Sequence, residues 1–344
     1  MTLRIGLVGY GGGGRWFHAP YIDAAEGVEL VGVVTRSPER IAELHAERPG
    51  MPVYAGLAEL LAAGVDAVTI TTPPQTRYDL VREAIAAGVH VVADKPFAPS
   101  AAVAAELGAL ADEAGVRLSV YHQRRRDADI QTLKGVLDGG ELGEILRFTS
   151  VFDLDEPGTL EAGPHGGLLR DLGSHVVDQA IWLFGAVQRV SAHLEWADLP
   201  EGRTDAGFAL RLDHVNGTAS FLSASKLNRV NRRVLDLYGA GGAYLATGSD
   251  VQTGAIKAGR RPKDDPAGWG FEPEQHWGRL FTAAGERVVP SVQGNHAGYY
   301  TAFARAIADG TPVPVPVSDA IQVLAVLDAA RTSASEHRTV DLDA

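Results

Sequence analysis

The chain has 344 residues, 45% of them hydrophobic and 22% charged, which is typical of a globular protein long enough for two domains. Its formal net charge of −12 argues against nucleic-acid or anionic-membrane partners, because both require a basic face. The absence of cysteine excludes disulfides, thiolate metal ligands and a cysteine nucleophile. Neither a secretory signal nor a membrane-spanning apolar run is visible, so we expect a soluble cytoplasmic protein that acts on a small-molecule substrate.

The first third of the chain alternates short apolar runs with amphipathic segments, which predicts a doubly wound parallel sheet. The expected strands are Arg4–Val8, Val28–Thr35, Ala67–Thr72, His90–Asp94 and Arg117–Tyr121. The expected helices are Pro38–Glu47, Thr76–Ala87 and Ala101–Ala114. Residues 1–122 are therefore predicted to form a dinucleotide-binding Rossmann domain.

After residue 122 the pattern changes to strands joined by short turns, which predicts a mainly antiparallel sheet in a second α/β domain, residues 123–344. The expected strands are Ile145–Phe152, Arg189–Trp196, Gly207–Leu212, Thr218–Ala224 and Val234–Tyr238. The expected helices are Asp127–Leu137, Gly166–Phe184, Gly298–Asp309 and Ser318–Ser335, and Gly259–Pro273 is expected to be a long surface loop. Trp182, Trp196 and Phe221 lie in periodic apolar runs and are expected in the core.

A glycine-rich loop follows the first strand directly. Its glycines, Gly9, Gly11, Gly12, Gly13 and Gly14, satisfy the pattern G-x-G-x-x-G, and Arg15 and Trp16 come next. Such glycines permit a tight turn and let main-chain amides approach a pyrophosphate closely. We expect this segment to bind a nicotinamide dinucleotide.

The end of the second strand bears on which nicotinamide is bound. An NAD enzyme usually carries an acid there, whereas this chain has Thr35, Arg36 and Ser37, followed by Arg40. Guanidinium groups pair well with a 2′-phosphate, so NADP(H) is favoured over NAD(H). The alternative is that Arg36 and Arg40 are solvated charges at the start of a helix.

Lys95 stands at the carboxyl end of a buried strand, before Pro96. Ligands bind at that edge of open parallel sheets, where an ammonium group can bond a substrate hydroxyl and stabilise a developing alkoxide. Pro96 restricts Lys95 to extended geometry and is a candidate for a cis bond. The alternative is an ordinary exposed lysine at the end of a strand.

Asp171 and His175 are four residues apart in an expected helix and share a face, and Asp178 continues that stripe. An acid beside an imidazole sets its tautomer, as a general acid/base requires, so we expect His175 to exchange the proton of the substrate hydroxyl. A metal site at these residues lacks a third ligand, and no metal is expected. Helix capping by Asp171 is the other alternative.

Together these segments resemble the Gfo/Idh/MocA oxidoreductase family, and nearest within it the NADP-dependent scyllo-inositol 2-dehydrogenase branch. The matching residues are Gly9–Gly14 with Phe17–Pro20, Thr71–Pro73, Asp94–Pro96 and Gly166–Gln179, and for the branch Ser119–Arg125 and Ala258–Asp265. The resemblance implies a Rossmann domain, a second domain with a large open sheet, and homodimers or homotetramers through that sheet. It also implies Lys95, Asp171 and His175 as the catalytic set, and adds Thr72 and Pro73 to the cofactor-binding residues.

The chain departs from the family pattern at three places. Asp94 replaces the usual glutamate, and Arg77 stands where a histidine is frequent. The segment Val151–Gly166 is shortened and carries Asp153, Asp155, Glu156, Glu161 and His165. This altered segment leaves the substrate open, with an amino sugar, a larger glycoside and an antibiotic precursor as candidates besides polyols.

Further substrate-contact candidates follow from position: His122 after the last Rossmann strand, Asp153 in the shortened segment, Asp178, and Tyr299 in a C-terminal helix. The sequence predicts hydride transfer between NADP(H) and a secondary alcohol or ketone of a sugar or cyclitol. Two alternatives remain at this stage. They are glycoside cleavage with internally recycled nicotinamide and non-catalytic cofactor sensing.

Overall fold

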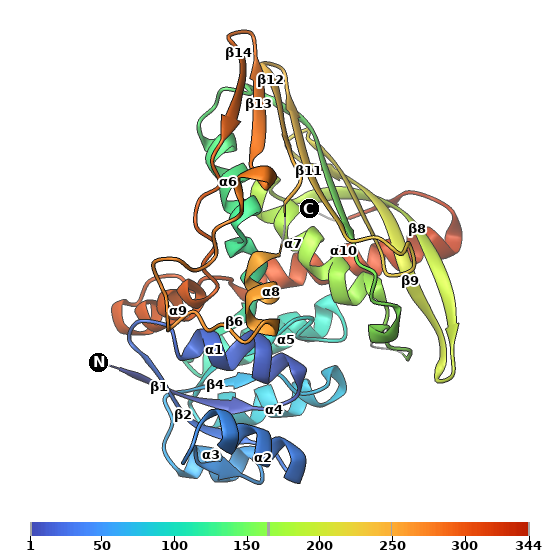
Figure 1. Cartoon of the computed structure of the whole chain (residues 1–344). Helices are drawn as coiled ribbons and strands as arrows, with labels where there is room; N and C mark the ends of the chain where they lie inside the picture. Colours follow the sequence, from blue (N-terminus) through green and yellow to red (C-terminus); the bar gives the residue numbers. More distant parts are fainter. Residues whose placement is uncertain (1, 164–165, 249, 343–344) are drawn as a thin grey trace. The chain divides into compact units, whose positions relative to one another are not determined.

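The computed structural model describes residues 2–163, 166–248 and 250–342. They divide into two compact units, whose elements are labelled in Figure 1. Unit 1 is formed by the chain up to Gln123, Gln252–Trp269 and Asn295–Ala320. Unit 2 is formed by Arg124–Val251, Gly270–Gly294 and the chain from Ile321 onward. Two segments that come late in the chain therefore belong to the unit that holds the N-terminal sheet.

Unit 1 contains a six-stranded, wholly parallel sheet in the order β3-β2-β1-β4-β5-β6. Its strands are β1 Leu3–Val8, β2 Val28–Val34, β3 Val53–Tyr54, β4 Ala67–Ile70, β5 His90–Asp94 and β6 Leu118–Tyr121. Every residue of β4 and β6 is buried, as a sheet covered on both faces requires. The strand order reverses at β1, so the predicted Rossmann sheet is confirmed.

Helices accompany this sheet (Figure 1). They are α1 Ala19–Ile22, α2 Pro38–Glu47, α3 Leu57–Ala62, α4 Pro74–Ala86, α5 Ala101–Glu113 and α9 Ala297–Asp309, and α8 Val251–Lys257 starts at the unit boundary. The hydroxyls of Ser37 and Ser100 accept the main-chain N–H groups of Arg40 and Val103 at the starts of α2 and α5. The short elements β3, α3 and α8 were not predicted.

Unit 2 contains a nine-stranded sheet in the order β14-β13-β12-β11-β7-β10-β9-β8-β15, in which only β7 and β10 pair in parallel. The strands are β7 Ile145–Asp153, β8 Val187–Leu199, β9 Gly202–His214, β10 Ala219–Ser225, β11 Arg232–Gly239, β12 Gly242–Ala246, β13 Gly278–Thr282, β14 Gly285–Val289 and β15 Val340–Asp341. The predicted mainly antiparallel sheet is confirmed. The strands β12 to β15 were not predicted.

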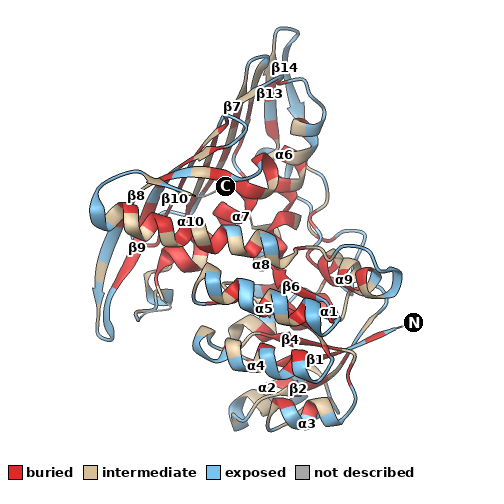
Figure 2. Cartoon of the chain, turned by 180° about the vertical axis from the view of Figure 1, so that it is seen from behind, coloured by how far each residue is buried: buried red, intermediate tan, exposed pale blue. Residues whose placement is uncertain are grey.

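One face of this sheet packs against helices α6 Ala128–Asp138, α7 Ser174–Phe184 and the later part of α10 Val317–Glu336. Figure 2 shows α7 buried along its length. Side chains alternate along each strand, so Leu222 enters this core while its neighbour Phe221 lies on the other face. Trp196 and Phe221 are 46% and 39% exposed, and the prediction that they are core residues is wrong. Phe221 lies on the uncovered face, which periodicity alone does not identify, whereas Trp196 shares a face with the buried Leu194 and is exposed toward the end of the long strand β8.

The segment Gly259–Pro273 contains turns but no helix or strand. Trp269 within it is buried, and its indole N–H donates to Gln252 Oε1 at 3.0 Å. The prediction of a surface loop is therefore wrong for this side chain, because a large aromatic ring with a satisfied donor gains from burial.

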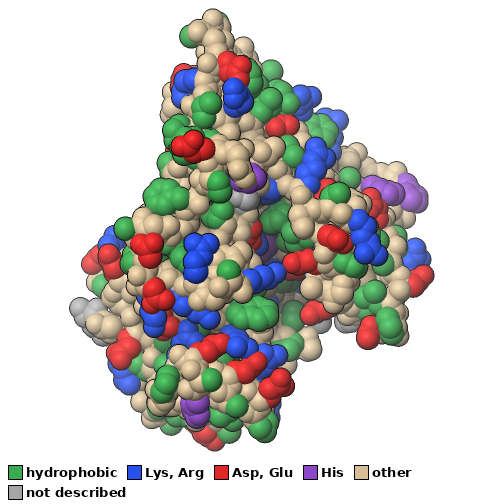
Figure 3. All heavy atoms as spheres, viewed as in Figure 1, with side chains coloured by type: hydrophobic (Ala, Val, Ile, Leu, Met, Phe, Trp, Pro, Cys, Tyr) green, Lys and Arg blue, Asp and Glu red, His purple; other side chains and the backbone are tan. Residues whose placement is uncertain are grey.

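On the face shown in Figure 3, acidic and basic side chains stand among one another. Of the helices in the described ranges, none has the length and apolar character that crossing a membrane requires.

Candidate active site

The glycine loop of unit 1 is shaped by contacts that leave no room for side chains. Gly9 has φ +107° and follows β1 directly. A Cβ at Gly14 would lie 2.1 Å from the Gly9 carbonyl oxygen, and one at Gly13 would lie 2.6 Å from Thr71 Oγ1. These glycines are therefore needed to bring the loop against its own backbone and against the end of β4.

Gly11 differs from these two positions because nothing lies within 4 Å of where its Cβ would be. A turn after Gly12 runs from Gly13 to His18 and leads into α1, and the Arg15 N–H donates to the Gly11 carbonyl at 2.9 Å. Open space beside an exposed main chain is what a dinucleotide pyrophosphate requires. The residues of this loop therefore fit the cofactor.

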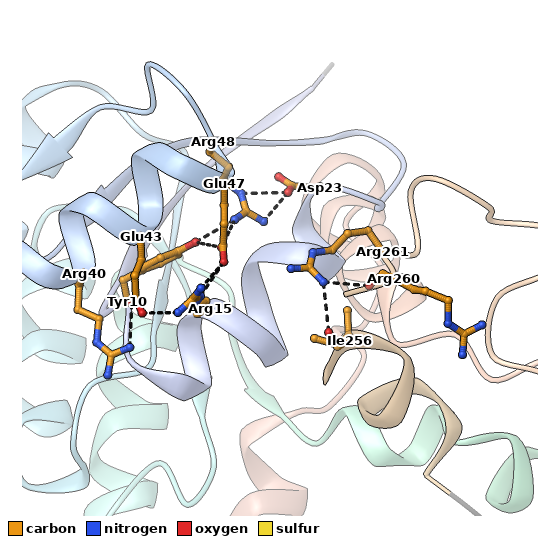
Figure 4. A network of polar contacts seen from close by, with 10 residues as sticks. All are labelled: Tyr10, Arg15, Asp23, Arg40, Glu43, Glu47, Arg48, Ile256, Arg260 and Arg261. Atoms are coloured by element: carbon orange, nitrogen blue, oxygen red, sulfur yellow. Dashed lines mark hydrogen bonds and ion pairs between the residues drawn. The ribbon is translucent and has the colours of Figure 1, made fainter. Parts of the chain in front are cut away.

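Arg15 reaches from this loop to two acids of α2, as Figure 4 shows. Its guanidinium lies 2.5 Å from Glu43 Oε1 and 2.6 Å from Glu47 Oε1. Although burial alone would raise the pKa of Glu47, its bonds with Arg15 and Tyr10 hold that pKa below its ordinary value. The sequence did not predict this cluster, because its members come from separate elements.

The predicted 2′-phosphate residues lie at the end of β2 and the start of α2. Thr35 is half-buried and Arg36 is exposed. Arg40 Nη1 lies 3.0 Å from Glu43 Oε2 (Figure 4). The Ser37 hydroxyl caps α2. Trp16 is partly exposed beside the glycine loop.

Asp94, at the end of β5, is the centre of a buried group of contacts in unit 1. Its carboxylate accepts the Thr71 hydroxyl and the Lys95 main-chain N–H, each at 2.9 Å. His18 Nε2 lies 3.6 Å from it, and Arg77 Nη2 lies 3.5 Å from it. Burial alone would raise the pKa of Asp94, but His18, Arg77 and Lys95 outweigh it and hold the pKa well below its ordinary value.

Lys95 is half-buried at the carboxyl edge of the parallel sheet, and the peptide bond to Pro96 is cis. Thr72 and Pro73 lie at the neighbouring strand end, where the Thr72 hydroxyl accepts the Thr76 hydroxyl at 2.7 Å and Pro73 precedes α4. The predicted cofactor loop and the predicted lysine thus meet through Thr71 and Asp94.

Two further substrate candidates of unit 1 have buried side chains. His122 follows β6. The Tyr299 hydroxyl donates to the Val120 carbonyl at 2.9 Å and lies 2.6 Å from Ser119 Oγ. Tyr300, its neighbour in α9, shares a 2.6 Å hydrogen bond with His18 Nδ1.

In unit 2, Asp171 and His175 do not belong to a single regular helix over Gly166–Phe184. Leu169–Gly173 forms one π-type turn, and α7 begins at Ser174. Gly167 has φ +94° and a Cβ there would lie 2.2 Å from the Asp205 carboxylate, which accepts the Leu169 N–H at 2.6 Å. Asp205 therefore caps this segment, the role considered for Asp171 in the sequence.

The Asp171 carboxylate is 46% exposed and lies 2.9 Å from the ammonium of Lys226, which is itself buried. The sequence did not predict Lys226. It comes just after β10, 55 positions from Asp171 along the chain, and no local pattern links the two.

His175 is buried near the start of α7, and Asp178 is buried one turn further along. The Asp178 carboxylate accepts Nε and Nη2 of Arg125 at 2.9 and 2.6 Å. Asp153 ends β7 and is buried, whereas His165 lies outside the described residues. Within the described ranges, no cluster of three or more His, Cys, Asp or Glu side chains is arranged to hold a metal ion.

A Rossmann unit whose glycine loop adjoins a strand-end lysine, in one chain with a second unit built on a large open sheet, defines an NAD(P)-binding oxidoreductase. Two models of one oxidoreductase family match the chain. The NAD-binding Rossmann fold matches residues 3–122, and the C-terminal alpha/beta domain matches residues 134–342. The protein therefore belongs to the Gfo/Idh/MocA oxidoreductase family, as its sequence predicts.

Relatives match along almost the entire chain. The NADP(+)-dependent scyllo-inositol 2-dehydrogenase IolW of Bacillus subtilis is 32% identical, with 99% of this chain and 96% of IolW covered. The oxidoreductase YdgJ of Escherichia coli is 35% identical, with 99% of both chains covered. The solved structure of the oxidoreductase yvaA of Bacillus subtilis superposes with a TM-score of 0.90 at 32% identity, covering 99% of both chains.

Proposed function

We propose that this protein is an NADP(H)-dependent dehydrogenase or reductase that transfers a hydride between the nicotinamide and a secondary alcohol or ketone of a sugar, cyclitol or sugar-derived substrate. The proposal rests most directly on how closely the glycine loop approaches Thr71 and Asp94. A Cβ at Gly13 would lie 2.6 Å from Thr71 Oγ1 and 3.5 Å from Asp94 Oδ2. The dinucleotide loop therefore lies beside the segment that carries Lys95, as a redox site at this sheet edge requires.

The proposal gives the charged side chains separate tasks. Lys95 donates a hydrogen bond to the reacting oxygen of the substrate and stabilises negative charge that develops on it. His175 takes the hydroxyl proton during oxidation and returns it during reduction. Asp171 stabilises the charged form of His175. We assign substrate contacts to His122 and Asp153. Asp178 and Tyr299 receive supporting roles, because Asp178 is already bound by Arg125 and the Tyr299 hydroxyl already donates to the Val120 carbonyl.

The preference for NADP(H) over NAD(H) rests on the missing acid at Thr35 and on the arginines nearby. The relative IolW is named as an NADP(+)-dependent enzyme, which supports this preference. We expect the double variant Arg36→Ala, Arg40→Ala to weaken NADPH binding about 10- to 100-fold, the worth of one charge-assisted hydrogen bond, with NADH binding unchanged. Equal affinity of the wild type for NADPH and NADH would contradict the preference. Fluorescence titration measures both constants.

Gly11→Ala tests the cofactor loop itself. A methyl group would enter the open space beside the main chain, so we expect NADPH affinity to fall about 10- to 100-fold while the unfolding temperature stays unchanged. Gly135→Ala in unit 2 is the matched control, since its Cβ also meets nothing within 4 Å. Undiminished NADPH affinity of Gly11→Ala would show that the dinucleotide lies elsewhere.

We further propose that the protein is a cytoplasmic homodimer or homotetramer that assembles through the outer face of the unit 2 sheet. Phe221 lies exposed on this face, and the Arg147 guanidinium stands 4.2 Å from the Tyr238 ring centroid. Exposed aromatic side chains of this kind are enriched in protein interfaces. Phe221→Glu should lower the mass measured by analytical ultracentrifugation.

A panel of scyllo-inositol, myo-inositol, glucose and glucosamine, assayed with NADP+ and NAD+, tests the activity. We expect turnover of at least one member with NADP+, and a higher rate for glucosamine if the acidic segment from Asp153 to Glu161 selects a cation. Cleavage of a glycoside without net formation of NADPH would point to internal recycling. Tight NADPH binding without any turnover would overturn the proposed function.

A further inference from the structure

Arg77 occupies an unfavourable place in unit 1. It lies in the first turn of α4, its side chain is only 7% exposed, and a cation near a helix N-terminus is opposed by the helix dipole. A buried guanidinium at such a position persists only where its donors are well matched. The hydrogen-bond partners of Arg77 therefore indicate which part of the structure it stabilises.

Those partners surround Lys95. Nη1 of Arg77 donates to the main-chain carbonyls of Asp94, Lys95 and Pro96 at 3.0, 2.9 and 2.8 Å. Nε donates to the Thr72 carbonyl at 2.8 Å, across to the end of β4. One planar group thus joins three consecutive peptide units to the neighbouring strand end, a geometry that an ammonium group cannot reproduce.

The other side of the same peptide is held by Asp94. The Lys95 N–H donates to Asp94 Oδ1, and Asp94 Oδ2 accepts the Thr71 hydroxyl. His18 approaches Asp94 Oδ1 from the glycine-loop turn. The main-chain N–H of Lys95 is therefore bonded to Asp94 and its carbonyl to Arg77. Because both partners are charged and largely buried, the main chain at Lys95 has little freedom to move.

We infer that Arg77 is a positioning residue for Lys95. It clamps the carbonyls on both sides of the lysine and so fixes where the ammonium group meets the substrate. The inference rests on the proposed function, in which Lys95 acts on the substrate oxygen. A displacement of about 1 Å at a reacting group lowers turnover by roughly 100-fold.

The test uses Arg77→Lys and Arg77→Met, with Arg233→Lys as the matched control. Arg233 is 6% exposed, pairs with Asp129 at 3.0 Å in unit 2, and has no part in the proposed chemistry. In the Arg77 variants we expect kcat per NADPH-binding site to fall about 100-fold for the fastest substrate of the panel, with less than tenfold change in its KM. Arg233→Lys should lower the unfolding temperature and leave kcat per site unchanged.

A second measurement needs no substrate. Hydrogen–deuterium exchange of peptides covering residues 92–97 should be about tenfold faster in Arg77→Lys than in wild type, and unchanged in Arg233→Lys. Unaltered exchange, or a kcat that falls no further than in the control, would overturn the inference. If Lys95→Ala keeps wild-type turnover, the proposed function is wrong. The exchange experiment needs no substrate, so it still tests whether Arg77 holds the main chain at Lys95.

Discussion

Asp94 in unit 1 and Asp171 in unit 2 both meet a cation, but they are held in opposite ways. The Asp94 carboxylate lies in a buried group of donors that includes the Thr71 hydroxyl and the Lys95 N–H. The Asp171 carboxylate is about half exposed and lies 2.9 Å from one buried ammonium, that of Lys226. The two acids are therefore suited to different tasks.

An enclosed carboxylate whose donors are already in place fixes geometry and resists protonation. A half-exposed one can adjust when a ligand arrives and can respond to charge on a neighbouring imidazole. On the proposed function, unit 1 provides a rigid support for Lys95, and unit 2 provides the groups for proton exchange. The predictions below test that division.

A large effect is expected at His175, to which we assign the proton exchange. His175→Ala should lower kcat by about 10²- to 10⁴-fold, because a positioned general acid/base contributes that much, and NADPH affinity should persist. His193→Ala, on an exposed position of β8, is the control and should keep wild-type turnover. Initial rates together with NADPH titration measure both. A kcat within threefold of wild type would assign the proton to another group.

The two aspartates of the α7 region should separate stability from turnover. Asp178→Asn leaves the buried Arg125 poorly compensated, and we expect a loss of about 3–5 kcal/mol in the free energy of unfolding. Asp171→Asn removes the charge that faces the buried Lys226 ammonium, but the carboxylate is itself half exposed, so we expect a smaller loss of about 1–3 kcal/mol, together with an at least tenfold lower kcat. Urea unfolding and initial rates measure the two quantities. If Asp171→Asn instead caused the larger loss of stability and Asp178→Asn the larger loss of kcat, the roles assigned to these two acids would have to be exchanged.

A smaller effect concerns pH. The pKa of Asp94 is lowered in the folded state, so its contribution to stability is present above the ordinary aspartate pKa of about 4 and is lost as pH falls below it. The gap in unfolding free energy between wild type and Asp94→Asn should therefore narrow as pH falls from about 5 to about 3. Asp138→Asn, an exposed acid of α6, should show no such gap. A constant gap for Asp94→Asn would mean that its charge is not what stabilises the fold.

Features that are local in the sequence were predictable. The places of Gly9–Gly14 after a strand and of Lys95 at a strand end were predicted correctly, because a loop and a strand end are contiguous stretches with a recognisable pattern. The helix at α7 was predicted at its regular part, but the π-type turn at Asp171 was not. The cap of this segment was not predicted either, because the contact of Asp205 with Gly167 and Leu169 joins distant parts of the chain.

Tertiary partners were not predictable for the same reason. Lys226 is separated from Asp171 by 55 positions, and Arg77 from the carbonyls that it binds by 17 to 19. Alternation also predicted strands without saying which face is covered, so Phe221 was misassigned to the core. The sequence thus identifies candidate chemical groups, and the fold shows how they are held.

The account depends most on Lys95 acting on the substrate. The direct measurement is kcat of Lys95→Ala for the fastest substrate of the panel, with the Kd of NADPH determined on the same preparation. We predict a loss of about 10³-fold or more in kcat, the worth of a charged donor at a developing alkoxide, with Kd within about tenfold of wild type. Turnover within tenfold of wild type, at unchanged NADPH affinity, would contradict the central role given to this lysine.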